Sequence, residues 1–444
     1  MVSNLPLPSI ALLPWGDLIE DFLDSINVPF EVFCNEMTGG WMFGYVEALK
    51  RVGIRSVLFC ISNRVTAAEQ YVHKPTGATI WILPAPKIHA MPRRLMQNPY
   101  GWTVEDTFGR IDRFRRPAFQ LLKDIAPYLA TPLFSLAREL KRENCRVILC
   151  QEYEYARFDA CVLLGQQMRL PVFATFQGGD FQLSRLERFF RPSTIRRCAG
   201  LIIATQTEIQ RVQSRYQVPA SKVAQIFNPI DVMNWRSHNP SELGTANRDR
   251  SRAALGIPLD AQVVVCHGRI DIHRKGLDIL MAAWGQICRD RPNRDLRLLL
   301  VGTGSDAEQL RQLIAAQALR GIFWINEYVR DRALMQQYLS AADLYTLASR
   351  HEGFPVAPIE AMACGLPIVA TCAPGIPDIL GSEGMGGLMV PCDDAPALAD
   401  AIGQVLDDQS LRLRLSHQAR LQAEQCFSLD AIGQQLHRFL WKAE

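Results

Sequence analysis

Two glutamates eight positions apart, Glu352 and Glu360, lie on either side of a Gly-Phe-Pro turn, and Glu360 opens an expected helix. The turn lets backbone N–H groups approach phosphate oxygens, and a helix N-terminus favours their negative charge. The two carboxylates can accept hydrogen bonds from sugar hydroxyls. This pattern is typical of a nucleotide-sugar site. Taken alone, it also fits a plain loop-to-helix junction in which Glu360 complements the helix dipole.

Two cations follow an apolar segment that lies closer to the N-terminus than the two glutamates. The expected strand 262–268 ends in Gly268 and Arg269, and Lys275 comes six residues later at a helix start. Arginine offers planar, bidentate hydrogen bonds to phosphate oxygens, and lysine offers a point charge. Together they would stabilise a departing diphosphate in place of a divalent metal, so we expect no metal and no cofactor. Solvated charges at a strand end are the alternative.

Weaker signals lie at other expected strand ends. Gly302 follows an apolar segment and would form a turn under the nucleotide, and backbone groups near Val329 would face a base edge. Gly39 and Gly40 follow the expected strand 31–37 and open a helix. A glycine pair there is typical of a phosphate or sugar contact, although a tight turn alone would also require it.

Short apolar segments alternate with helical periodicity along the whole chain, which predicts parallel sheets covered by helices. We predict an α/β fold of two Rossmann-like, doubly wound domains that face each other across a cleft. The polar stretch 236–252 is the expected linker. The expected strands are 31–37, 56–62, 79–85, 146–152, 171–177 and 201–206 in the first half, and 262–268, 296–302, 322–328, 344–349 and 367–373 in the second.

Composition excludes several classes of protein. A length of 444 residues suits two domains, and a net charge of +3 with no recognised binding motif argues against nucleic acid. The 12 cysteines include no Cys-x-x-Cys pair, which argues against a zinc or redox site and favours a reducing compartment. The sequence lacks a basic signal region and any apolar run of about 18 residues, so we expect a cytoplasmic protein.

Positive charge is concentrated in one part of the chain. Residues 81–200 contain 19 Lys and Arg against 11 Asp and Glu, with clusters at 113–116 and 185–191. A solvated helix face would account for them. The functional alternative is peripheral contact with an anionic membrane or an acidic acceptor.

Taken together, the motifs resemble the retaining glycosyltransferases of family 4, which have the GT-B fold. The matching segments are 268–276, 341–345, 352–355 and 360–367. The resemblance is strong over about 262–430 and weaker in the first half. It implies an acceptor-binding domain at 1–232, a nucleotide-sugar domain at 233–424, and a last helix, 425–444, that crosses back to the first domain.

The resemblance implies roles for the matching positions. Arg269 and Lys275 would bind the diphosphate, Glu360 the ribose, and Glu352 the donor sugar. The expected donor contacts are Gly39, Gly40, Gly268, Arg269, Lys275, Gly302, Val329, Glu352, Gly353, Phe354, Pro355, Val356 and Glu360, of which Glu352, Arg269 and Lys275 form the catalytic group.

One departure from the family is clear. Gln177 stands where the family carries a histidine after a strand, and a second family histidine is replaced within 150–154. Glutamine exchanges hydrogen bonds but carries no proton at neutral pH. Either Gln177 only positions a sugar or acceptor, or Glu152, Glu154 or Asp180 takes over the histidine's role, or activity is low.

The resemblance predicts transfer of a sugar from a nucleoside-diphosphate donor to a hydroxyl of a glycan or lipid-linked acceptor, with retention, in polysaccharide or glycolipid biosynthesis. Other expectations stay open. They are a non-catalytic GT-B partner subunit that binds nucleotide sugar or glycan, an epimerase or phosphorylase on the same fold, and a module that binds the inner membrane surface.

Overall fold

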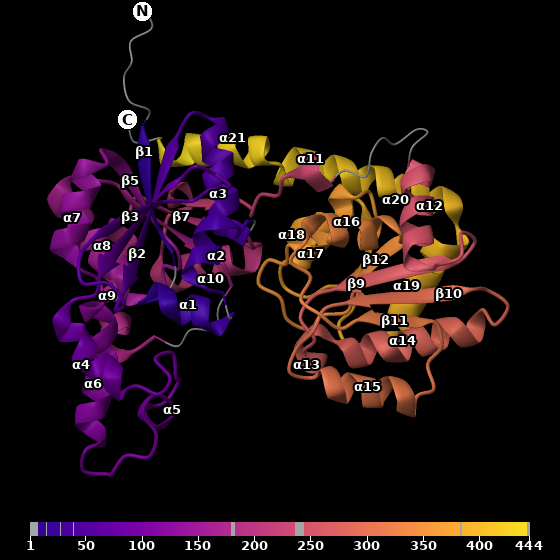
Figure 1. The fold of residues 1–444 in the computed structure, drawn as a ribbon, viewed down its shortest axis with the longest axis horizontal. Coiled ribbons are helices and arrows are strands. Elements are labelled where there is room, and N and C mark those ends of the chain that lie inside the picture. The colour runs from indigo at the N-terminus through magenta and orange to yellow at the C-terminus, as the bar shows by residue number, and fades with distance from the viewer. Residues whose placement is uncertain are drawn as a thin grey trace, which may run out of the picture. The chain divides into compact units, whose positions relative to one another are not determined.

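The computed structural model of the chain forms two compact units (Figure 1). Unit 1 comprises Met1–Phe227 and Ile432–Glu444, and unit 2 comprises Asn228–Ala431. The structure describes residues 8–14, 16–26, 28–38, 40–178, 183–235, 244–381 and 384–441.

Unit 1 is built on an eight-stranded sheet with the order β3-β4-β2-β1-β5-β6-β7-β8. Among the strand pairs of the described residues, β3–β4 alone is antiparallel. Strand order reverses between β1 and β5, which pair with each other, so the sheet has its switch point there. The strands are β1 (Ser9–Leu13), β2 (Arg55–Ser62), β3 (Glu69–Val72), β4 (Thr79–Pro84), β5 (Cys145–Cys150), β6 (Val172–Phe176), β7 (Gly200–Ile203) and β8 (Val223–Gln225).

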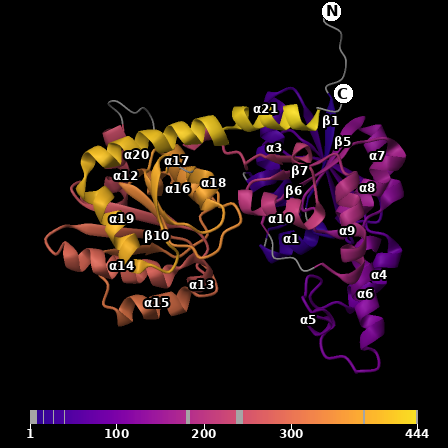
Figure 2. The same ribbon diagram turned by 180° about the vertical axis from the view of Figure 1, so that it is seen from behind.

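Helices cover this sheet. Helices α7 to α10 lie around the strands (Figure 2). Their apolar side chains join those of the strands in one core cluster. The helices of the unit are α1 (Ile19–Ser25), α2 (Phe30–Asn35), α3 (Gly40–Arg51), α4 (Lys87–Leu95), α5 (Val104–Phe108), α6 (Arg116–Leu129), α7 (Leu133–Arg142), α8 (Ala156–Met168), α9 (Arg185–Arg197), α10 (Gln206–Tyr216), the short 3₁₀ turn Ala220–Lys222, and the part of α21 (Leu429–Leu440) that starts at Ile432.

The start of the sheet corrects the sequence prediction. The segment expected as the strand 31–37 is helix α2, in which Phe33 and Cys34 are buried. The first strand is instead β1, whose five residues are all buried. Gly40 therefore begins α3 after a helix rather than after a strand, and Gly39 lies outside the described residues. Strands β3, β8 and β14 (Gly387–Val390) were not predicted.

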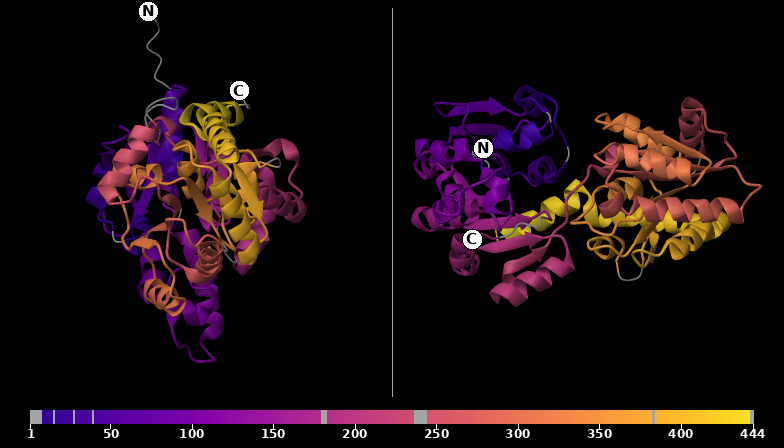
Figure 3. Two further views of the ribbon diagram at one scale, coloured as in Figure 1. Left: turned by 90° about the vertical axis from the view of Figure 1, so that its right-hand side faces the viewer. Right: turned by 90° about the horizontal axis from the view of Figure 1, so that it is seen from below.

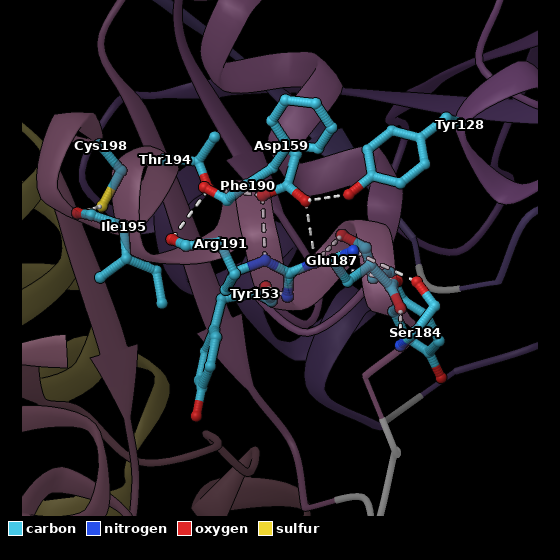
Figure 4. Close-up of polar contacts among 11 residues, drawn as sticks. Tyr128, Tyr153, Asp159, Ser184, Glu187, Phe190, Arg191, Thr194, Ile195 and Cys198 are labelled. Atoms are coloured by element: carbon cyan, nitrogen blue, oxygen red, sulfur yellow. Dashed lines mark hydrogen bonds and ion pairs between the residues drawn. The ribbon is translucent and has the colours of Figure 1, made fainter. Parts of the chain in front are cut away.

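Part of the predicted basic cluster 185–191 is internal. The Arg191 side chain is fully buried, and its Nε donates to the Asp159 carboxylate at 2.9 Å (Figure 4). Tyr128 donates to the same carboxylate at 2.7 Å, and Thr194 donates to it as well. This network joins α6, α8 and α9, so Arg191 lies inside the fold and does not contribute to a charged surface.

Unit 2 is built on a six-stranded parallel sheet with the order β11-β10-β9-β12-β13-β14. Its switch point lies between β9 and β12, which pair with each other. The five strands predicted for this half all exist, and β14 adds a sixth. Besides β14, they are β9 (Gln262–His267), β10 (Leu296–Val301), β11 (Ile322–Ile325), β12 (Leu344–Leu347) and β13 (Ile368–Thr371).

Apolar side chains of α14 and α19 form one core with these strands. The helices of unit 2 are α11 (Val232–Trp235), α12 (Gly244–Leu255), α13 (Ile272–Lys275), α14 (Leu277–Asp290), α15 (Ala307–Ala316), α16 (Arg332–Ser340), α17 (Ala357–Ala363), α18 (Ile376–Leu380), α19 (Ala395–Asp407), α20 (Gln409–Gln422) and a π-helical turn, Ala423–Phe427.

The expected linker 236–252 is partly helical. Residues 236–243 lie outside the described residues, and α12 covers the rest. The fully buried Arg252 anchors this helix, because it donates to Asp343 at 2.8 Å and to the Ala341 carbonyl at 2.9 Å. Local polarity predicted a linker, whereas a buried ion pair with a distant residue makes this segment part of the domain.

Candidate functional site

The predicted site residues of unit 2 gather at the switch point of its sheet. Strand β9 leads into Gly268, β10 leads into Gly302, and β12 leads into the loop 348–356. Because these strands are parallel neighbours, the three loops lie at one edge of the sheet. Ligands of open α/β sheets bind at this edge, where the strand order reverses.

Lys275 and Glu352 form an ion pair across this point. The Lys275 Nζ donates to Glu352 Oε1 at 2.6 Å, and the Ser349 hydroxyl donates to the same oxygen at 2.6 Å. The two charged side chains are 21% and 5% exposed, so the Glu352 charge depends on this cation. The family resemblance implied separate roles for the two residues. The structure makes them one charged group in which Glu352 Oε1 is already occupied.

Backbone hydrogen bonds hold the two loops together. The N–H groups of Arg350 and His351 both donate to the Arg274 carbonyl, at 3.0 and 3.3 Å. The Arg350 guanidinium donates to the His273 carbonyl at 2.8 Å and to both carboxylate oxygens of Asp278 at 2.8 Å. These contacts fix the cation-bearing segment against the Glu352 loop, so the ion pair is held by its surroundings.

Two glycines permit the loops to approach each other. A Cβ on Gly276 (φ +59°) would lie 1.9 Å from the Ala348 carbonyl oxygen. A Cβ on Gly302 (φ +140°) would lie 1.9 Å from the Gly268 carbonyl oxygen. Both positions combine a positive φ with a contact that leaves no room for a side chain. Gly302 therefore supports the loop that carries Arg269, in addition to any contact with a ligand.

His267 orients Glu360. Its Nε2 lies 3.0 Å from Glu360 Oε2, and its ring is buried at the end of β9. The ring's Nδ1 is buried without a hydrogen-bond partner among the described residues, which assigns the proton to Nε2 as donor to the carboxylate. Sequence analysis missed this residue, although its place at the last position of an apolar strand was a usable signal.

The other predicted donor contacts differ in their exposure and in the residues that they pack against. Arg269 is exposed, and its guanidinium forms no ion pair with the residues that the structure describes. Phe354 is buried and lies 6.2 Å from the Phe427 ring, so it packs inside unit 2. Gly353 and Pro355 lie against Gly375, and Val356 precedes α17. Val329 is half-buried beyond β11.

Glu360→Ala should raise the KM for the donor about tenfold and leave kcat nearly unchanged. In the role that the family resemblance implies, Glu360 would bind the donor ribose, and such a hydrogen bond acts on the ground state and the transition state alike. Steady-state kinetics over donor concentration check this. Glu308→Ala, which removes a carboxylate that is 70% exposed on α15, is the control. An equal loss in kcat would contradict a pure ribose contact.

In unit 1, Glu152 and Gln177 are in contact. The Gln177 backbone N–H donates to Glu152 Oε1 at 2.7 Å. Glu152 follows β5 at the switch point with φ +56°, and burial raises the pKa of its carboxyl to about 8. Glu154, by contrast, pairs with Arg211 at 2.7 Å. Of the three acids predicted to replace the family histidine, Glu152 contacts Gln177, Glu154 has its own cation, and Asp180 lies outside the described residues.

Sequence analysis also missed two neighbours of this switch point. The buried Arg157 donates to the Asp17 carbonyl at 2.7 Å and to the Pro14 carbonyl, which fixes the loop after β1. Burial raises the pKa of the Asp17 carboxyl to about 7. The loops after β1 and β5 thus carry two buried acids that are easily protonated, Asp17 and Glu152.

The raised pKa of Glu152 gives stability a defined pH dependence. Between pH 4.5, the ordinary glutamate value, and about 8, the folded chain keeps a proton that the unfolded chain releases. This carboxyl therefore lowers the free energy of unfolding as pH rises through that window. Glu152→Gln should remove this decrease in the free energy of unfolding. The variant should therefore be more stable than the parent above pH 8 by on the order of a few kcal/mol.

Denaturant unfolding of parent and variant at several pH values checks this. Glu31→Gln removes an exposed carboxylate of the same unit and should show no such trend. A stability difference between Glu152→Gln and the parent that stays constant across the window would contradict a buried, protonated Glu152.

Comparison with known proteins agrees with this geometry. The family model "Glycosyltransferase Family 4" matches residues 42–233, and "Glycosyl transferases group 1" matches residues 261–408. Two α/β units built on largely parallel sheets, with these motifs at the strand ends of unit 2, are the architecture of the GT-B class of glycosyltransferases. The chain belongs to family 4 of these proteins, as its motifs predicted.

Two relatives are similar to this chain over about half of its length. The D-inositol 3-phosphate glycosyltransferase of Corynebacterium urealyticum is 30% identical over 246 residues, 54% of this chain and 56% of that protein. The alpha-D-kanosaminyltransferase of Streptomyces kanamyceticus is 27% identical over 243 residues, 54% and 60% of the two chains. The chain thus spans a little over half the length of these relatives.

Two solved structures share the fold over almost the whole chain. Sucrose-phosphate synthase from Thermosynechococcus elongatus has a TM-score of 0.63 at 21% identity, covering 98% of this chain and 100% of that one. HepE from Anabaena in complex with UDP has a TM-score of 0.67 at 17% identity, with the same coverage.

Proposed function

We propose that this chain transfers a sugar from a nucleoside-diphosphate donor to a hydroxyl of a glycan or lipid-linked acceptor, with retention at the anomeric carbon. The observation that carries the proposal is the Lys275–Glu352 pair at the switch point of unit 2, beside the exposed Arg269. A fold neighbour, HepE, was solved with UDP-glucose, which supports a nucleotide-sugar donor. Polysaccharide or glycolipid biosynthesis would use such an acceptor.

The cations would act on the leaving group. Arg269 is free to bind phosphate oxygens bidentately, and Lys275 would share its charge between Glu352 and the diphosphate. Negative charge grows on the diphosphate as its bond to the anomeric carbon breaks, so fixed cations stabilise the transition state more than the bound donor. This is the role that a metal ion would otherwise fill, and we propose that none is needed.

The hydrogen bonds that Glu352 accepts favour a mechanism in which the acceptor oxygen attacks the anomeric carbon from the same side as the leaving phosphate. A covalent glycosyl-enzyme would need a free carboxylate close to the anomeric carbon. One oxygen of Glu352 already accepts hydrogen bonds from Lys275 and Ser349, which lowers its nucleophilicity. In our proposal the acceptor oxygen bonds to the anomeric carbon, the bond to phosphate breaks, and a phosphate oxygen takes the hydroxyl proton. Glu352 would hold sugar hydroxyls.

A donor screen tests the proposal. Purified protein would be tested with UDP-, GDP- and ADP-sugars by thermal shift and by release of nucleoside diphosphate, with and without EDTA. We expect sugar donors with one particular base to stabilise the protein, and the corresponding nucleoside diphosphate to be released slowly. Adding EDTA should change neither result. Binding of no donor, with or without a glycan acceptor, would contradict the proposal. Binding without release or transfer would favour a non-catalytic subunit.

A further inference from the structure

Helix α4 of unit 1 and the two loops that flank α5 expose large apolar side chains to solvent. On α4, Ile88, Met91 and Leu95 are 65%, 74% and 46% exposed. Trp102, just before α5, is 61% exposed, and Phe114, between α5 and α6, is 97% exposed. We call these five side chains, with the cations among them, the α4–α6 surface. Such side chains usually lie inside proteins, and a gathering of them marks an interaction site.

Helix α4 has its apolar side turned outward. Ile88, Met91 and Leu95 are spaced by three and four residues, so they share one face of the helix. His89 and Pro92 are the buried residues of this helix. A helix on a protein surface normally turns its apolar stripe to the core. The stripe of α4 is therefore available to something outside this chain's own core.

The same segment carries unpaired positive charge. Residues 86–123 contain eight Lys and Arg against three Asp and Glu. Arg93 pairs with Asp21, and Arg116 pairs with Glu105. The exposed cations of the segment that form no ion pair with any described residue are Lys87, Arg94, Arg110, Arg113 and Arg115. On α4, Lys87 and Arg94 stand directly beside the apolar stripe.

The elements that carry these side chains form one substructure. Helices α4 and α5 both pack on α6. The rings of Phe108 and Phe119 join α5 to α6 at 5.0 Å, and Lys123 of α6 donates to the Trp102 carbonyl at 2.9 Å. Figures 1 and 2 show the three helices together at one end of unit 1, and Figure 3 shows the same purple segment projecting from it.

We propose that the α4–α6 surface docks unit 1 on a bilayer that contains anionic lipid. Apolar side chains interleaved with cations match the boundary between acyl chains and anionic headgroups. A protein partner would have to pair five cations as well as cover the apolar stripe, whereas anionic headgroups supply negative charge throughout. Attachment would be peripheral, and no helix among the described residues is long and apolar enough to span a bilayer. This inference does not rest on the proposed activity.

Co-sedimentation of the full chain with vesicles tests the proposal. We expect binding to phosphatidylcholine vesicles that contain one part in three of phosphatidylglycerol, and little binding to pure phosphatidylcholine. Replacing Lys87, Arg94 and Arg113 together with serine should weaken binding about a hundredfold, since each cation near an anionic surface contributes a factor of about five. Replacing Met91 and Phe114 with serine should weaken it about tenfold or more.

The control removes the same charge elsewhere. Serine at Lys74, Lys141 and Arg146, exposed cations of unit 1 outside this surface, should change binding little. All variants lie at exposed positions, and matching melting temperatures would verify folding. Equal binding to both vesicle types, or an equal loss in the control, would overturn the proposal. The proposal would also be overturned if replacing Met91 and Phe114 with serine changed self-association or capture of a protein but left vesicle binding unchanged.

Discussion

Lys275→Ala is expected to lower kcat for sugar transfer by about 10²- to 10³-fold, the cost of losing one preorganised contact to developing negative charge. The loss should be larger than that of an ordinary phosphate contact. Lys275 also neutralises Glu352, whose side chain is only 5% exposed, so the variant leaves a buried carboxylate unpaired beside the departing diphosphate. Steady-state transfer kinetics and a denaturation curve, measured on the same preparation, check both effects.

A double variant separates the two causes. Adding Glu352→Gln to Lys275→Ala removes the unpaired negative charge and should restore the free energy of unfolding, while kcat stays low because the diphosphate still lacks its cation. Recovery of kcat in the double variant would show that Lys275 matters only as the partner of Glu352. A kcat within a few-fold of the parent in the single variant would rule out the proposed diphosphate contact.

Gly302→Ala is expected to destabilise unit 2 by about 3 kcal/mol or more, and to abolish donor binding in whatever fraction stays folded. The new Cβ would lie 1.9 Å from the Gly268 carbonyl oxygen, so the loop that carries Arg269 must move. The neighbour is backbone and cannot rotate away as a long side chain would. Denaturant unfolding gives the stability change, and titration with the donor found in the screen gives the binding change.

Gly268→Ala is the matched control for stability. Gly268 has φ +148°, close to the +140° of Gly302, but a Cβ there would meet nothing within 4 Å. It should therefore show only the cost of the backbone conformation, about 1 to 3 kcal/mol. If the two variants lost equal stability, the close approach of the two loops would not explain the effect at Gly302.

Much of unit 2 could be predicted because its strands and motifs are recognisable in short, contiguous segments of the sequence. Apolar segments bounded by glycine and polar residues predicted β9 to β13, and the motifs that resemble family 4 placed Arg269, Lys275, Glu352 and Glu360 after these strands. Parallel strands bring all their carboxyl ends to one edge, so predicting the strands was nearly enough to predict that these residues lie at the same edge of the sheet.

Unit 1 was harder to predict, because local pattern and tertiary packing disagree there. Segment 31–37 contains apolar residues that fit a short strand or a helix, and packing of Phe33 decided for the helix. The cluster 185–191 reads as a charged surface, yet Arg191 is buried on Asp159. In α4, spacing alone does not tell which face turns to the core.

The sequence by itself determined the two-unit α/β class, the family and the positions of the charged residues, since these depend on local periodicity and short motifs. Tertiary structure decided the pairing: Lys275 with Glu352, 77 residues apart, and His267 with Glu360, 93 residues apart. Which side chains meet across a switch point depends on strand order, and strand order is set by the packing of the whole sheet rather than by any local segment.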